Sequence, residues 1–155
     1  MKISARGRYA VRGMLDVALH SRNFPTPLAD ISLRQGITLS NLEQLFSKLR
    51  RAGLVRSVRG PGGGYFLAKR AKDITIGDIL RAVDEPLAPD LKATDLEPEP
   101  GAGRRIDDLL VSLLWSRLAE QIRHILESVT LDDLVAEWEK STPQGFMEHR
   151  FLFNI

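Results

Sequence analysis

Residues 39–69 read LSNLEQLFSKLRRAGLVRSVRGPGGGYFLAK, and they carry the strongest structural signals in the chain. Leu42, Leu45, Phe46 and Leu49 follow the i, i+3, i+4, i+7 spacing of a helix with one buried face, so we predict a helix over 39–52 that ends at Gly53. Residues 55–59 and 65–69 read as two short strands. The glycine-rich segment 60–64 between them reads as a turn, so a helix followed by a β-hairpin is predicted.

The residues on either side of this stretch predict three further helices. Apolar residues at 11, 14, 15, 18 and 19 predict a helix from about Ser4 to His20. A short second helix is expected to be capped by Thr26, to begin with Pro27 and to end at Gly36. A small fourth helix is expected over 76–83. This order of elements predicts a mainly α fold with a small β-hairpin wing, the winged helix-turn-helix.

Beyond residue 86 the composition changes. Residues 87–103 are rich in proline and acidic side chains and are predicted to be a linker or sensor loop. A long helix is expected over 105–128, then a short one from Thr130 to about Lys140 and an apolar tail at 151–155. The predicted division is therefore 1–86, 87–103 and 104–155. The apolar stripe of the long helix exceeds what a small domain can cover, so we expect it to pair two copies through Leu110, Leu114, Leu118, Ile122 and Ile125.

Charge and composition narrow the class of function. Residues 1–86 hold 15 of the 22 Lys and Arg but 7 of the 20 Asp and Glu, so a basic first half precedes an acidic remainder. A basic domain favours a polyanionic partner. No apolar run is long enough to span a membrane and no signal peptide is evident, which predicts a cytoplasmic protein. No catalytic arrangement is evident either, so we do not expect an enzyme.

The helix over 39–52 is predicted to enter the DNA major groove. Ser40, Asn41, Glu43 and Gln44 lie toward its start and are the candidate base-reading residues. A glutamine suits adenine, and a glutamate accepts from the amino group of cytosine. Ser40 and Glu43 also match a capping box, so base reading and capping both remain open for Glu43.

Other basic residues and the glycines of the hairpin are predicted to contact DNA. Arg59, at the tip of the hairpin, is expected to enter the minor groove. The alternative for the hairpin is a flexible loop with incidental charge; a nucleotide-binding loop is set aside because it lacks the Gly-Lys-Ser/Thr ending. The candidate contacts to the DNA backbone are Arg6, Arg8, Lys48, Arg51, Arg56, Gly60, Gly62 and Gly63.

Several segments identify the chain by resemblance. They are GRYAV at 7–11, MLDVA at 14–18, PLADI at 27–31, LEQLF at 42–46 and SVRGPGGGY at 57–65. The chain resembles the Rrf2 family of bacterial transcription regulators, in the branch of iron–sulfur cluster regulators. The resemblance implies a homodimer on a roughly two-fold operator, with Ser40, Glu43 and Gln44 reading bases and Arg59 in the minor groove. Asn41 stands where the family has tyrosine.

The chain departs from this branch mainly at the site that would bind the iron–sulfur cluster. The resemblance implies a two-iron–two-sulfur cluster held by three cysteines and a histidine, but this chain has no cysteine. The sequence therefore predicts a cluster-free DNA-binding regulator, a repressor, without a cofactor, which binds DNA constitutively or responds to an unknown effector. The alternatives are a protein–protein interaction module and a sensor of a small ligand or metal. The candidate ligands for such a sensor are Asp90, Asp95, Glu97, Glu99, His124 and His149.

Overall fold

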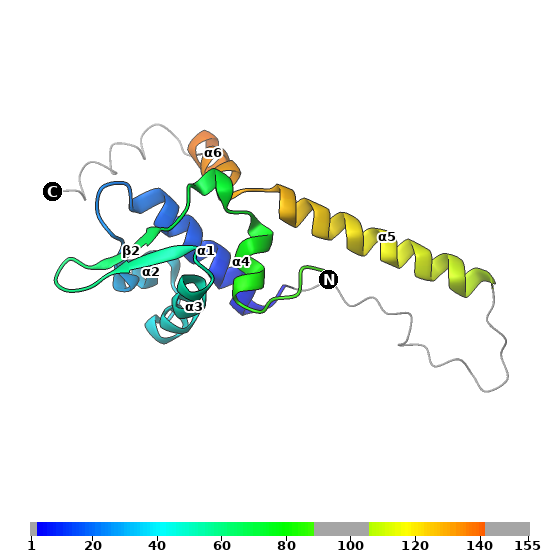
Figure 1. Ribbon diagram of the computed structural model, residues 1–155, viewed down its shortest axis with the longest axis horizontal. Coiled ribbons are helices and arrows are strands. Elements are labelled where there is room, and N and C mark those ends of the chain that lie inside the picture. Colours follow the sequence, from blue (N-terminus) through cyan, green and yellow to red (C-terminus); the bar gives the residue numbers. More distant parts are fainter. Residues whose placement is uncertain (1–2, 89–105, 142–155) are drawn as a thin grey trace.

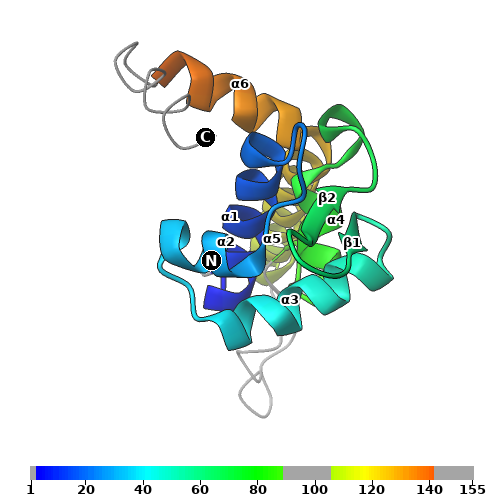
Figure 2. The same ribbon diagram turned by 90° about the vertical axis from the view of Figure 1, so that its left-hand side faces the viewer.

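The computed structural model describes residues 3–88 and 106–141. The elements in these ranges are α1 (Ala5–His20), α2 (Leu28–Gln35), α3 (Leu39–Arg51), β1 (Val55–Val58), β2 (Gly64–Leu67), the 3-10 turn η1 (Ala71–Asp73), α4 (Ile76–Ala82), α5 (Ile106–Ser128) and α6 (Leu131–Ser141). Together they confirm the predicted winged helix-turn-helix. α3 and α6 lie on opposite sides of α1 (Figure 2), and most of α5 extends away from the winged domain (Figure 1).

The core joins α1, α2 and α3. All four residues predicted to face inward on α3 are buried: Leu42, Leu45, Phe46 and Leu49. Phe46 reaches α1 at Gly13, where an added Cβ would lie 2.9 Å from the ring of Phe46. The absence of a side chain at position 13 thus allows α1 and α3 to approach closely, and this approach fixes the direction of α3.

The predicted cap at Thr26 is wrong, and so is the capping role that the sequence left open for Glu43. Thr26 does not cap α2, which begins after Pro27 without a side-chain cap. Ser40 and Glu43 form no capping box, because α3 begins two residues earlier than that box requires. The cap is Thr38, whose hydroxyl accepts a 3.3 Å hydrogen bond from the Asn41 N–H. Glu43 is therefore not needed to cap the helix.

The wing is tied to the start of α2. β1 and β2 pair antiparallel, with Val55 opposite Leu67 and Val58 opposite Gly64. Thr26 and Tyr65 exchange two backbone hydrogen bonds of 2.9 Å, and Thr26 is buried in this single-residue bridge beside the wing. A Cβ at Gly64 would lie 2.4 Å from the Thr26 carbonyl. Glycine at 64 therefore allows this attachment, which holds the base of the wing.

The chain returns from α5 to the winged domain at α4. Thr75 and Thr130 form a bridge, flanked by hydrogen bonds from the Ile76 N–H to the Val129 carbonyl (2.9 Å) and from the Leu131 N–H to the Ile74 carbonyl (2.8 Å). Arg81 on α4 also contacts Glu127 on α5 at 2.8 Å. The last turn of α5 and the start of α6 are therefore anchored to the winged domain.

The rest of α5 lacks a covering layer within the described ranges. α5 has no buried residue, as expected for a helix that leaves the domain. Leu110, Leu114, Leu118 and Ile125 are 41–61% exposed, whereas Ile122 is half-buried. Because exposed leucines in such number mark an association surface, the helix is suited to a partner.

Candidate nucleic-acid interface

The outer face of α3 presents the predicted base-reading residues. Ser40, Asn41, Glu43 and Gln44 are all exposed. A shallow hollow runs along this face, lined by Glu43, Gln44, Ser47, Lys48 and Arg51. Within the described ranges, the side chains of Glu43 and Gln44 make no hydrogen bond or ion pair with another residue. Both side chains are thus available to a ligand, and their donors and acceptors are of the kind that reads base edges.

A second hollow lies between α1 and α3 and brings the start of the chain into the same surface. Arg6 and Tyr9 of α1 line it together with Asn41, Gln44 and Lys48 of α3. The structure thus places Arg6 beside the candidate recognition helix, although 42 positions separate Arg6 from Lys48 in the sequence. Arg8 is exposed on α1 and pairs with no other described residue.

Two of the predicted DNA-backbone cations already have acidic partners. Lys48 Nζ lies 2.6 Å from Asp84 Oδ2. Arg6 donates to the Asp84 carbonyl at 2.9 Å and lies 3.6 Å from Glu85 Oε2. Glu85 in turn accepts from the Ser4 N–H at 2.8 Å, and the hydrogen bonds from Ser4 hold the pKa of Glu85 below its ordinary value. The acidic pair at 84–85 was not predicted as part of this surface.

The wing presents its own cations. The Arg56 guanidinium lies 4.5 Å from the centre of the Phe66 ring, a cation–π contact that orients an otherwise exposed side chain. Arg59 lies directly after β1 at the hairpin tip and is exposed. Its side chain makes no ion pair with another described residue, so the charge is available to a polyanion.

The glycines of the hairpin tip have structural roles of their own. Gly60 and Gly62 adopt φ values of 94° and 72°, which residues other than glycine rarely adopt. A Cβ at Gly63 would lie 2.3 Å from the Val58 carbonyl oxygen. The turn itself therefore requires these glycines, and their proposed close approach to DNA is an additional role.

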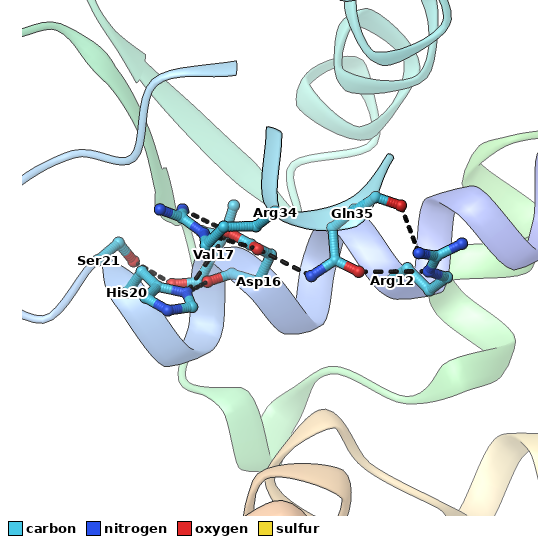
Figure 3. Close-up of polar contacts among 7 residues, drawn as sticks. All are labelled: Arg12, Asp16, Val17, His20, Ser21, Arg34 and Gln35. Carbon is cyan, nitrogen blue, oxygen red and sulfur yellow. Dashed lines mark hydrogen bonds and ion pairs between the residues drawn. The ribbon is translucent and has the colours of Figure 1, made fainter. Parts of the chain in front are cut away.

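A buried polar cluster fastens α2 to α1 and was missed from the sequence (Figure 3). Asp16 is fully buried, and its carboxylate accepts from Arg34 at 2.7 and 3.0 Å and from Gln35 at 2.9 Å. His20 Nδ1 lies 2.9 Å from the Asp16 carbonyl oxygen and 3.5 Å from the same carboxylate, so this histidine belongs to the cluster. Arg12, one turn before Asp16 on α1, donates a hydrogen bond to the side chain of Gln35 at 3.2 Å. The one available signal was a lone carboxylate within an apolar helical run.

The residues present do not fit an iron–sulfur cluster. Thiolates are the ligands such clusters require, and the sequence has no cysteine. Within 3–88 and 106–141, no group of three or more His, Asp or Glu side chains could hold a metal ion. His124 is exposed on α5, while the other candidate ligands, Asp90, Asp95, Glu97, Glu99 and His149, lie outside the described residues, as do the apolar tail and most of the 87–103 loop.

These features are those of a DNA-binding transcription regulator with a winged helix-turn-helix. The model of the Rrf2 family, described as an iron-dependent transcriptional regulator, matches residues 3–137. The chain belongs to the Rrf2 family. None of the described helices is long and apolar enough to cross a membrane.

Known relatives agree with this assignment. The chain is 53% identical to the HTH-type transcriptional regulator IscR of Pectobacterium carotovorum over 87% of this chain and 79% of that protein. Among solved structures, it is similar to IscR of T. potens (TM-score 0.71, 34% identity, 96% of each chain). It is also similar to CymR, the global cysteine regulator of B. subtilis (TM-score 0.72, 35% identity, 88% of this chain and 98% of that one). The predicted resemblance to IscR-like regulators is thus confirmed.

Proposed function

We propose that this chain is a homodimeric, sequence-specific transcription repressor that binds a two-fold operator without an iron–sulfur cluster. The observation that carries the proposal is the joint placement of exposed polar side chains on α3 and exposed arginines on the wing, in a chain without cysteine. A regulator of this kind acts where the chromosome lies, which places it in the bacterial cytoplasm.

In this proposal α3 enters the major groove. Ser40, Asn41, Glu43 and Gln44 contact base edges, and the wing carries Arg59 to the adjacent minor groove. The backbone contacts come from Arg6, Arg8, Lys48, Arg51 and Arg56, together with the amides of Gly60, Gly62 and Gly63. The charge of this surface supports DNA as its partner, because a module that only docks proteins has no need for so many cations around one helix and its wing.

The second copy is proposed to pair through α5. The exposed residues Leu110, Leu114, Leu118 and Ile125, with Ile122, form the proposed contact. Recognition of a two-fold operator requires the two α3 helices of the proposed dimer to lie on one side of it, so that they reach half-sites about one helical turn apart.

The test is a selection of random duplex DNA by the purified full-length protein, without iron or sulfide added. The expected result is enrichment of a two-fold motif, followed by tighter binding to that duplex than to a scrambled one. A folded, dimeric protein that enriches no motif would contradict the proposal.

A further inference from the structure

The end of α4 forms a tight corner at Asp84 and Glu85. The Asp84 N–H donates to the Arg81 carbonyl at 3.1 Å, and the Glu85 N–H donates to the Leu80 carbonyl at 2.9 Å. This is the paired hydrogen bonding of a Schellman motif, which needs a left-handed residue after the cap. Asp84 supplies it with φ 57°. The helix ending therefore fixes the direction in which the Asp84 side chain leaves the backbone.

The two acidic residues of this corner have different environments. Glu85 is 7% exposed and bonds Ser4 at the start of α1, so its role is structural. The Asp84 side chain is 73% exposed, and its carboxylate has one partner among the described residues, Lys48 Nζ at 2.6 Å. The Lys48 ammonium holds the pKa of Asp84 below its ordinary value, so the carboxylate is charged at neutral pH.

We propose that Asp84 stands in for a DNA phosphate: it occupies Lys48 in the free protein and thereby lowers the affinity for any duplex. The inference rests on the proposed function, in which Lys48 contacts the DNA backbone. In this inference Asp84 affects the affinity for DNA although it does not itself contact DNA. The Asp84 carbonyl also accepts from Arg6, so the corner faces both cations of the hollow between α1 and α3.

Lys48 must break its ion pair with Asp84 before it can contact a phosphate. An exposed ion pair contributes little, equivalent to a factor of up to about five in an equilibrium constant. When Lys48 turns to a phosphate, Asp84 is left unpaired and attracts a cation from solution. Fewer cations are then released overall, so the dependence of affinity on salt becomes shallower, by less than the slope of about 0.9 that one phosphate contact contributes.

The experiment compares Asp84→Asn and Asp84→Gly with the wild type. Asparagine and glycine both tolerate the positive φ, so the corner is retained while the carboxylate is lost. Asp132→Asn is the matched control, because Asp132 is exposed on α6, which lies on the opposite side of α1 from α3. Dissociation constants for the selected duplex and a scrambled one are measured by fluorescence anisotropy from about 50 to about 300 mM KCl. Thermal unfolding verifies that each variant is folded.

We expect both Asp84 variants to bind both duplexes about two- to fivefold more tightly at low salt, with a steeper salt slope. Asp132→Asn should change neither quantity to that extent. In a Lys48→Gln background, Asp84→Asn should lose most of its effect, because the Lys48 ammonium that this substitution would free is then absent. Unchanged or weaker binding by the Asp84 variants, or an equal gain from Asp132→Asn, would overturn the inference. Failure of the wild type to distinguish the two duplexes would instead contradict the proposed function.

Discussion

Replacing Asp16 by alanine tests the polar cluster that holds α2 against α1. The carboxylate is fully buried and accepts three hydrogen bonds from Arg34 and Gln35. Removing one partner of a buried ion pair costs about 3–5 kcal/mol, because the remaining charge is left uncompensated. The Arg34 side chain is 36% exposed and can recover part of its hydration. We therefore expect a loss at the low end, about 3 kcal/mol of the free energy of unfolding.

Urea unfolding followed by far-ultraviolet circular dichroism measures this loss. Wild type and variant are compared at one protein concentration, because the proposed dimer would be stabilised by association. Asp73→Ala is the matched control: it breaks an exposed ion pair with Arg70 and should cost about 1 kcal/mol or less. A loss below about 1 kcal/mol for Asp16→Ala would refute the reasoning that this cluster holds the helix-turn-helix together.

The same pair of proteins gives a pH dependence. Burial alone would raise the pKa of Asp16, but hydrogen bonds from His20, Arg34 and Gln35 outweigh burial and hold that pKa well below its usual range. A lowered pKa in the folded state stabilises the protein above the unfolded-state pKa of about 3.9, and this contribution is lost as the pH falls further. The difference between wild type and Asp16→Ala should be constant near pH 7 and shrink below about pH 4. A difference that does not shrink would contradict the lowered pKa.

Three further predictions concern DNA binding and assembly. Arg59→Ala should weaken binding to the selected duplex by about 1–3 kcal/mol in an anisotropy titration, and unchanged affinity would place the wing outside the groove. Glu43→Ala should relax discrimination at one base step without lowering the melting temperature, since Thr38 caps α3; a loss of stability with unchanged discrimination would contradict this role. Leu114→Glu combined with Leu118→Glu should give a monomer by sedimentation equilibrium and abolish operator binding, whereas a dimer would exclude α5 as the interface.

Hydrophobic periodicity was sufficient to predict the helices and the wing. The four buried positions of α3 are fixed by their spacing alone, and the hairpin by its run of glycines. The residue at which each helix begins was harder to predict from the sequence. Thr38 and Ser40 are both good capping residues, and the choice depends on the turn at Gly36, where φ is 63°. Thr26 was misassigned because its backbone is used by the wing, which is a tertiary contact.

The chemistry of the surface was only partly predictable. Residue type and helical face placed Glu43 and Gln44 on the exposed side of α3 correctly. The pairing of Lys48 with Asp84 could not be foreseen, because 36 positions separate them and the contact depends on how α4 ends. The same holds for Asp16 and Arg34, which meet only when α2 packs on α1.

The most direct test of the central claim is the affinity of the cysteine-free protein for a duplex in which one half of the selected two-fold motif is scrambled. Each mismatched base pair typically costs about 1–3 kcal/mol, so a dimer that reads both halves should lose at least about tenfold in affinity. Binding to the half-scrambled duplex as tight as to the intact one would contradict two-fold recognition by paired α3 helices.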